Sequence, residues 1–356
     1  MGVLASPLAL VDQPYLSSLY GALVERGARV EHYSGRRLRS GGWDVWHLHW
    51  PEQFLNRPQR VGVVLGNGAR LLWSVGRARR RGVAVVWTVH NLGSHERNHP
   101  WLERAFWFLL TRRLDGIIAL TEGGRRAARE RFPRLLHVPA AVVPLGHFRK
   151  PVEAKLDRVD ACRRLGVAAD RQVVCFLGLI RPYKGVPTLV RAFRDLAEER
   201  AVLLVAGRPS TPGLAREVEA AAAGDPRVHL VLRRLSDEEI EDHLAAADLV
   251  ALPYREVLNS STAVHALSAD RPVRGPAKGA MAELQESIGG EWVRLFSGDL
   301  DTGDLEQALD WARRSERSRE APLDHLSWPA IADATLGAYD QAIGHRRRRR
   351  ERSGGP

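Results

Sequence analysis

Short apolar runs alternate with longer amphipathic segments, and each half of the chain contains one such series. Eight runs are predicted to be strands, namely residues 43–50, 83–91, 116–120 and 140–146 in the first half and 172–179, 201–207, 228–235 and 249–254 in the second. Strands that alternate with helices form parallel sheets covered by helices on both faces. A chain of 356 residues can bury two hydrophobic cores. We therefore predict an α/β protein with two Rossmann-like domains.

The segments between the strands carry helix signals. Residues 100–114 begin with a proline and have an apolar stripe at helical spacing, and residues 122–132 form a second, charged segment. Ser236 and Glu239 have the spacing of a capping box, which predicts a helix over residues 236–247.

Composition suggests the domain boundaries. Residues 147–171 are mixed and polar, so we place the linker there, between domains of residues 1–150 and 151–327. An amphipathic segment over 328–344, opened by Trp328, is predicted to be a terminal helix that returns to the first domain. Residues 345–356 combine an arginine run with Ser-Gly-Gly-Pro and are expected to be a basic disordered tail, because they have no apolar surface to bury.

Charge is distributed unevenly. Residues 1–150 hold 23 Lys and Arg against 10 Asp and Glu, whereas the rest of the chain holds 30 against 32. A basic first half indicates an anionic partner, either a lipid surface or a nucleic acid.

Cysteine usage and hydropathy indicate the compartment. Cys162 and Cys175 are the only cysteines, too few for a disulfide framework. No apolar run approaches the roughly 18 residues of a membrane-spanning helix, and no basic segment precedes the apolar stretch at the N-terminus. We expect a cytoplasmic protein that reaches the inner membrane face only peripherally. Its heavy use of Arg and Trp is typical of a bacterial protein.

Two stretches in the second half could carry chemistry. In residues 176–188 an apolar strand ends at Gly178 and is followed by Arg181, Lys184 and a helix that starts near Gly185. Two cations beside a helix N-terminus, at the C-terminal edge of a parallel strand, suit a diphosphate. A solvated basic turn would have the same sequence.

The second stretch covers residues 252–275. Its predicted helix begins with four small polar residues, Asn259, Ser260, Ser261 and Thr262. Such a first turn leaves backbone N–H groups open to phosphate oxygens, and Glu256 upstream can accept hydrogen bonds from sugar hydroxyls. An ordinary helix cap beside a surface glutamate is the alternative. The presence of Arg181 and Lys184 in the same domain favours a sugar-nucleotide site.

Together these residues resemble the retaining glycosyltransferases of family 4, which have the GT-B fold. The resemblance spans most of the chain and also includes the terminal Trp328 helix. The segments of this chain that carry the resemblance are HLHWPE at 47–52, TVHN at 88–91, DGIIALTE at 115–122, VPLGH at 143–147, GLIRPYKGV at 178–186 and ALSADRP at 266–272.

The resemblance implies an enzyme with two Rossmann-like domains that face each other across a cleft. The first domain would bind a hydroxyl acceptor, and the second a UDP-sugar or GDP-sugar. A hexose-type sugar would be transferred with retention of its anomeric configuration and without a metal or another cofactor. Synthesis of a polysaccharide, a glycolipid or a natural-product glycoside would fit, and a lipid-linked acceptor or an anionic membrane would suit the basic first half.

The resemblance also implies roles for single residues. Arg181 and Lys184 match the family's phosphate-binding pair, and the Asn259–Thr262 turn is assigned to the same diphosphate from its own residues. His90 matches the histidine near the donor sugar, and Glu256 is similar to the first donor-site carboxylate, so these two are the expected catalytic residues. Gly178 and His265 are assigned to the donor sugar or ribose. Four residues are assigned to the acceptor side, namely Tyr15, His49, Asn91 and His147.

The sequence departs from the family in two places. His265 stands where the family often has a second glutamate that grips the ribose, and Glu256 is one residue out of register. The family's glycine-rich first loop is missing, and Ser6, Pro7 and Leu8 occupy that region. Because this loop usually faces the acceptor, an unusual acceptor is expected.

Histidines in the first half raise the question of a zinc site. His47 and His49 share one face of a strand, and His90, His95 and His99 follow in one loop. No carboxylate or thiolate stands at tight ligand spacing beside them, so we expect no metal site and a structural role for His47 and His49.

Two other functional classes stay open. A catalytically silent sugar-nucleotide-binding protein would keep the donor site without transferring sugar, and His265 is compatible with that loss. A basic nucleic-acid-binding protein would use the charge of the first half. Aromatic residues are not interleaved with those charges as stacking platforms would require, so no nucleic-acid partner is expected.

Overall fold

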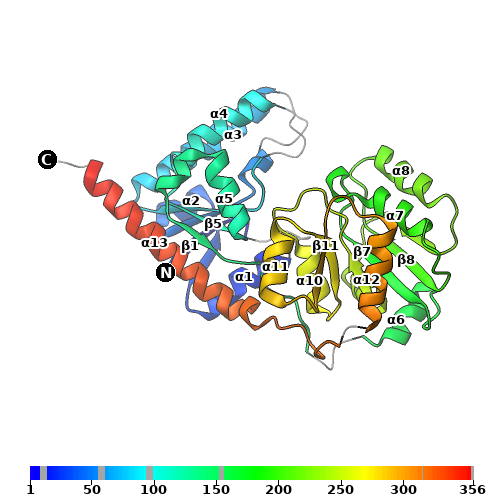
Figure 1. The fold of residues 1–356 in the computed structure, drawn as a ribbon. Coiled ribbons are helices and arrows are strands. Elements are labelled where there is room, and N and C mark those ends of the chain that lie inside the picture. The colour runs from blue at the N-terminus through cyan, green and yellow to red at the C-terminus, as the bar shows by residue number, and fades with distance from the viewer. Residues whose placement is uncertain (9–13, 55–60, 94–98, 152–155, 315, 354–356) are drawn as a thin grey trace. The chain divides into compact units, whose positions relative to one another are not determined.

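The computed structural model describes residues 1–8, 14–54, 61–93, 99–151, 156–314 and 316–353, which fall into two compact units (Figure 1). Unit 1 is built from Met1–Gly146 and His325–Pro356, and unit 2 from His147–Asp324. The expected boundaries, after residues 150 and 327, each lie within four residues of these. Each unit contains one six-stranded parallel sheet with helices, which confirms the predicted α/β class.

Unit 1 has the strand order β2-β1-β3-β4-β5-β6. The strands are β1 (Gly2–Ser6), β2 (Arg29–His32), β3 (Val45–His49), β4 (Ala84–Val89), β5 (Gly116–Ala119) and β6 (Ala140–Val142). Its helices are α1 (Pro14–Glu25), α2 (Gly35–Ser40), α3 (Val61–Arg80), α4 (Pro100–Thr111), α5 (Glu122–Arg131) and α13 (Trp328–Ser353), with short 3-10 turns η1 (Pro51–Phe54) and η2 (Pro133–His137). The sequence pattern predicted β3 to β6 but missed β1 and β2.

The two faces of this sheet differ in chemistry. Trp46 and Leu48 of β3 and Trp87 of β4 form an apolar core with the inner sides of α3 and α4. Because side chains alternate along a strand, His47 and Thr88 point to the opposite face. That face is covered by α1 and α13, as the bond of His47 to Tyr339 of α13 shows.

The prediction of a disordered tail is wrong for residues 345–353, which continue helix α13 along unit 1 (Figure 1). The arginine run is held because its side chains find partners on unit 1. Arg346 donates to the backbone oxygen of Arg79, and Arg349 donates to that of Leu114 at 3.3 Å. Arg349 also lies 3.8 Å from the fully buried carboxylate of Asp115. Arginines that the sequence suggested were exposed to solvent thus bind backbone carbonyls at helix ends and a buried carboxylate.

Unit 2 has the strand order β12-β11-β10-β7-β8-β9. The strands are β7 (Gln172–Leu177), β8 (Ala201–Ala206), β9 (Val228–Val231), β10 (Leu249–Ala251), β11 (Val273–Pro276) and β12 (Val293–Phe296). The helices are α6 (Arg158–Leu165), α7 (Val186–Arg194), α8 (Pro212–Ala222), α9 (Asp237–Ala246), α10 (Ser261–Ser268), α11 (Ala280–Ile288) and α12 (Thr302–Arg314), with the 3-10 turn η4 (Pro182–Lys184). The capping box at Ser236 and Glu239 is present. The expected linker, residues 147–171, contains α6, and neither β11 nor β12 was predicted.

Each sheet changes direction once. In unit 2 the chain proceeds outward from β7 through β8 and β9, and then returns to the other side of β7 with β10. In unit 1 the change lies between β1 and β3. Ligands of open parallel sheets bind beyond the carboxyl ends of the strands at such a switch point, because the following loops diverge there.

Gly185 lies where the loop after β7 crosses the loop after β10. Its φ is +63°, and a β-carbon there would lie 2.3 Å from the backbone oxygen of Pro253. Gly166 has a similar φ of +68° but open space around it.

We expect Gly185→Ala to destabilise unit 2 more than Gly166→Ala does. The control change costs only the left-handed strain of about 1–2 kcal/mol. Gly185→Ala adds a backbone clash, for which overpacking costs of about 1–3 kcal/mol are typical. Urea unfolding of both variants measures the difference, and equal losses would mean that the two loops can separate without penalty.

Candidate functional site

In unit 2, residues predicted to bind a diphosphate meet at the switch point between β7 and β10. A β-carbon at Gly178 would lie 3.2 Å from Thr262 Oγ1 and 3.5 Å from Lys184 Nζ. Thr262 also donates a hydrogen bond of 3.4 Å to the backbone oxygen of Leu177, the last residue of β7. Gly178 therefore leaves open backbone between the lysine and the first turn of α10.

The two predicted cations of this edge carry uncompensated charge. The Nζ of Lys184 lies 5.3 Å from the ring centroid of Tyr254 and 5.9 Å from that of Phe176. Arg181 directly precedes the 3-10 turn that contains Lys184, and both side chains are half-buried. Within the described ranges, no carboxylate forms an ion pair with either side chain. Half-buried cations without a counter-ion favour an anionic ligand.

The segment that carries Glu256 is fixed by backbone contacts on both sides. The N–H of Arg255 donates to Tyr183 O at 2.8 Å, and that of Ala280 donates to Val257 O at 3.3 Å. Glu256 itself is exposed, and its carboxylate makes no hydrogen bond or ion pair with the part of the chain that the structure describes. The structure thus holds its backbone beside the Arg181–Gly185 loop, while its side chain stays available to a ligand.

The predicted polar turn forms the start of α10. Ser260 is the N-cap, and its side chain accepts a 3.2 Å hydrogen bond from the N–H of Ala263. Asn259 precedes it half-buried, and Ser261 is exposed. Ser260 therefore has the ordinary capping role, whereas Thr262 links the helix to β7.

His265 lies one turn further along α10. Its ring forms an edge contact with Phe148, with centroids 4.3 Å apart, and burial lowers its pKa. The position at which a ribose-binding carboxylate was expected in the family thus holds a neutral imidazole packed on an aromatic ring.

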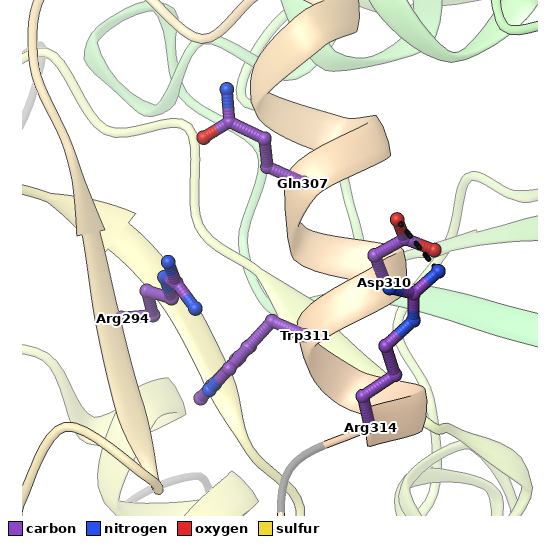
Figure 2. A pocket seen from close by; sticks show the side chains of 5 residues that line it. All are labelled: Arg294, Gln307, Asp310, Trp311 and Arg314. Carbon is purple, nitrogen blue, oxygen red and sulfur yellow. Dashed lines mark ion pairs between the residues drawn. The ribbon is translucent and has the colours of Figure 1, made fainter.

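A surface hollow of about 360 Å³ lies elsewhere on unit 2, between β12 and α12 (Figure 2). Arg294 lies with its guanidinium 6.0 Å from the Trp311 ring, and Asp310 pairs with Arg314 at 3.7 Å. None of the predicted site residues lines this hollow. We therefore place the candidate donor site at the β7–β10 edge.

In unit 1, the ends of β3 and β4 bring together Tyr15, His49 and His90. His49 Nδ1 lies 2.8 Å from His90 Nε2. The Tyr15 ring contacts both imidazoles edge-on, with centroids 6.0 Å and 5.5 Å away. The neighbouring Asn91 donates to Glu52 Oε1 at 3.1 Å. His147, also assigned to the acceptor side, belongs to unit 2, where its Nδ1 accepts from the N–H of Arg149.

Two residues of this edge were not predicted as site residues, although both lie in the HLHWPE sequence. Trp50 has a φ of +47°, a strained conformation for a side-chain-bearing residue, and its ring stacks on His90 with centroids 4.1 Å apart. Glu52 is only 2% exposed, and burial raises its pKa to about 7. Its Oε2 has no hydrogen-bond partner among the described residues. A buried carboxylate at a strand end, with one oxygen unused, can exchange a proton near neutral pH.

A chain of hydrogen bonds runs behind this edge. Tyr339 Oη lies 2.7 Å from His47 Nδ1, and His47 Nε2 lies 2.6 Å from Thr88 Oγ1. Tyr20 Oη lies 2.8 Å from His49 Nε2. These groups are buried and satisfied by one another, which agrees with the expected structural role of His47 and His49. The described residues contain no group of three His, Cys, Asp or Glu that could hold a metal ion.

The bonds favour one arrangement of protons. Each imidazole is neutral, because burial lowers the pKa of His47 and His90 to about 3 and that of His49 well below its usual value. If Tyr339 donates to His47 Nδ1, then His47 Nε2–H donates to Thr88. Tyr20 is then left to donate to His49, whose Nδ1–H donates to His90 Nε2. This arrangement gives both tyrosine protons an acceptor and places the proton of His90 on Nδ1.

The buried histidines predict a loss of stability in acid. Below the unfolded pKa of about 6.5, the unfolded chain binds protons that the folded chain excludes, so the free energy of unfolding falls as the pH falls toward 3. Each imidazole contributes a slope of up to about 1.4 kcal/mol per pH unit. Urea unfolding at several pH values should show a smaller slope for His49→Gln than for the wild type. The control His137→Gln removes an exposed imidazole and should leave the slope unchanged. Identical slopes in all three proteins would contradict the buried network.

Comparisons with known proteins all identify glycosyltransferases. Residues 12–146 match the family described as Glycosyltransferase Family 4, and residues 171–309 match Glycosyl transferases group 1. A GDP-mannose:glycolipid 4-beta-D-mannosyltransferase of Xanthomonas campestris pv. campestris is 34% identical over 335 residues, which cover 93% of this chain and 89% of that protein.

Solved structures show the same fold at low identity. Sucrose-phosphate synthase from Thermosynechococcus elongatus aligns with a TM-score of 0.61 at 17% identity, over 98% of both chains. HepE of Anabaena, solved with UDP and glucose, aligns with a TM-score of 0.63 at 15% identity, also over 98% of both chains.

Proposed function

Because the chain belongs to glycosyltransferase family 4 and has the GT-B fold, we propose that it transfers a mannosyl residue from GDP-mannose to a hydroxyl group of a lipid-linked acceptor. The chain is a glycosyltransferase. The choice of donor and acceptor is supported by the activity that the name of the Xanthomonas relative gives, since the similarity covers nearly the whole length of both chains. The observation that carries the proposal is the pair of uncompensated cations at the β7–β10 switch point.

The chemistry of the donor follows from this edge. Transfer forms a bond between the acceptor oxygen and the anomeric carbon and breaks the bond from that carbon to the terminal phosphate oxygen of GDP-mannose. Negative charge then accumulates on the departing GDP. Arg181 and Lys184 would stabilise that charge, and backbone N–H groups at the start of α10 would add to it. These groups do the work that a divalent metal does in other transferases, so we propose a metal-independent reaction.

The remaining predicted residues would orient the two substrates. Glu256, exposed on its fixed segment, would accept hydrogen bonds from sugar hydroxyls. His90, held by His49 and Trp50, would position the reacting end of the sugar, and Tyr15 and Asn91 would lie on the acceptor side. A lipid-linked acceptor also implies work at the cytoplasmic face of a membrane, with no nucleic-acid partner. Among the described residues, no helix is long and apolar enough to cross a bilayer.

The proposal predicts that GDP binding depends on both cations. Arg181→Ala or Lys184→Ala should weaken GDP binding by about 2–5 kcal/mol, because each removes one partner of a desolvated charge contact. Isothermal calorimetry measures the loss, and EDTA should leave wild-type binding unchanged. Arg216→Ala, which removes an exposed arginine on α8, is the matched control. Wild-type affinity in both site variants would refute the assignment of the donor site.

The anomeric outcome divides the proposal into two mechanisms. The family resemblance implies retention, in which the acceptor attacks from the face that the phosphate leaves and the phosphate takes the acceptor proton. The name of the Xanthomonas relative instead specifies a β-D-mannosyl product. GDP-mannose carries an α-linked sugar, so a β product requires inversion and a base that removes the acceptor proton. We keep retention as the prediction and inversion as the second candidate.

Substitution of Glu52 distinguishes the two mechanisms, because Glu52 would be the base that inversion requires. Under retention, NMR of the product should show an α linkage, and Glu52→Gln, which still accepts the bond from Asn91, should keep activity within several-fold. Under inversion the product is β, and loss of the base should lower kcat/KM by about 10²–10⁴. In that case wild-type kcat/KM should also rise with pH through about 7, as Glu52 loses its proton. Full activity in both His90→Ala and Glu256→Ala would show that the site is misplaced under either mechanism.

A further inference from the structure

Large apolar side chains are exposed mainly on two neighbouring helices of unit 1. Seven of the eleven exposed large hydrophobic residues of the described chain lie on α3 and α4, namely Val61, Val63, Leu65, Trp73, Trp101, Phe108 and Leu109. Trp73 and Trp101 are 59% and 62% exposed, values that are unusual for the largest apolar side chain. This concentration calls for a partner, because monomeric soluble proteins seldom leave large apolar patches in water.

Helix α3 is apolar on its outer side as well as its inner side. Val61, Leu65 and Trp73 recur at multiples of four residues on the solvent side, while Val64 and Val75 are buried in the core. A helix that only covers a sheet needs one apolar stripe, and its opposite side is normally polar. The second stripe of α3 therefore has no role within unit 1.

The outer sides of α3 and α4 lie over the same face of the sheet. Both helices bury their inner residues in the same core, against Trp46 and Trp87, and they contact each other. Figure 1 shows them together at one side of unit 1. Their exposed residues thus form one surface, which we call the α3–α4 surface and define by the seven residues above.

Arginines accompany the exposed aromatic rings. The guanidinium of Arg112 lies 3.8 Å from the Phe108 ring centroid, and that of Arg77 lies 5.5 Å from the Trp73 ring. Arg70 and Arg104 are also exposed on these helices. Helix α3 contains no acidic residue, and α4 contains only Glu103. The apolar surface is therefore set in positive charge.

We propose that the α3–α4 surface docks on an anionic lipid bilayer. Tryptophan and phenylalanine enter the boundary between headgroups and acyl chains, and arginines beside them bind lipid phosphates. The aliphatic Val61, Leu65 and Leu109 favour acyl chains over a nucleic acid, which offers them no apolar partner. The inference rests on the proposed function for its purpose, because a lipid-linked acceptor lies in such a surface. The arginine run of α13 is a weaker candidate, since Arg346 and Arg349 bind the backbone of unit 1.

Sedimentation with vesicles tests the proposal on the full chain. Wild-type protein should partition onto phosphatidylglycerol–phosphatidylcholine vesicles, less onto pure phosphatidylcholine, and less at high salt. Trp73→Gln combined with Trp101→Gln should lower partitioning on the anionic vesicles at least tenfold. Arg104→Gln combined with Arg112→Gln should make partitioning onto the anionic vesicles less dependent on salt. Val159→Gln, which removes an exposed apolar side chain on α6 of unit 2, should change nothing.

Several outcomes would overturn the docking surface. These are wild-type partitioning by the tryptophan variant, equal binding to neutral and anionic vesicles, and self-association in ultracentrifugation that the tryptophan changes abolish. Preferential binding to a single-stranded oligonucleotide through the same residues would also overturn it. Calorimetry of GDP binding distinguishes a failure of the docking surface from a failure of the proposed function. The tryptophan variant should bind GDP like the wild type, whereas a wild type that binds vesicles but not GDP would refute only the proposed transferase site.

Discussion

The hydrogen bond from Tyr339 Oη to His47 Nδ1, 2.7 Å long, joins the last helix of the chain to the centre of the first sheet. A parallel sheet is stable only when both faces are covered, and α13 covers the polar face of this one. The bond also sets the proton positions of the buried imidazoles, because it commits one nitrogen of His47 and leaves Tyr20 to His49. The proton position of His90 at the sheet edge thus depends on a contact made by Tyr339, almost 250 residues further along the chain.

Both candidate edges follow from one property of parallel sheets, namely that the carboxyl ends of all strands lie on the same side. Gly178 and Lys184 follow β7, and Thr262 of α10 comes 78 residues after Lys184, yet the three meet because β7 and β10 are neighbours. In unit 1 the ends of β3 and β4 bring His49 and His90 within hydrogen-bond distance in the same way. Cations gather at one edge and neutral imidazoles with a buried carboxylate at the other, as binding a diphosphate and handling a hydroxyl would require.

The sequence predicted the elements whose signal is local and missed those whose stability comes from distant partners. The apolar runs of β3 to β10 and the Ser236 capping box could be recognised within a few residues. Edge strand β2 is half-exposed and has no apolar run, so its pairing with β1 left no such signal. The helical residues 345–353 have an amino-acid composition typical of disorder, and their partners lie near residues 79 and 114. Glu52 was missed because the surrounding HLHWPE sequence does not reveal that this carboxylate is buried, and burial is what raises the pKa of Glu52.

The close approach of α13 to the first sheet has a consequence for the order in which the protein folds. A β-carbon at Gly116 would lie 2.8 Å from that of Ala342, so the helix packs directly on β5. During synthesis, all of His147–Asp324 leaves the ribosome before α13 does. Domains generally fold as the chain emerges, so unit 2 can complete its core while the first sheet still has one uncovered face. Unit 1 is therefore the last to be finished, and a chain that stops before Trp328 would contain a folded unit 2 and an incomplete unit 1.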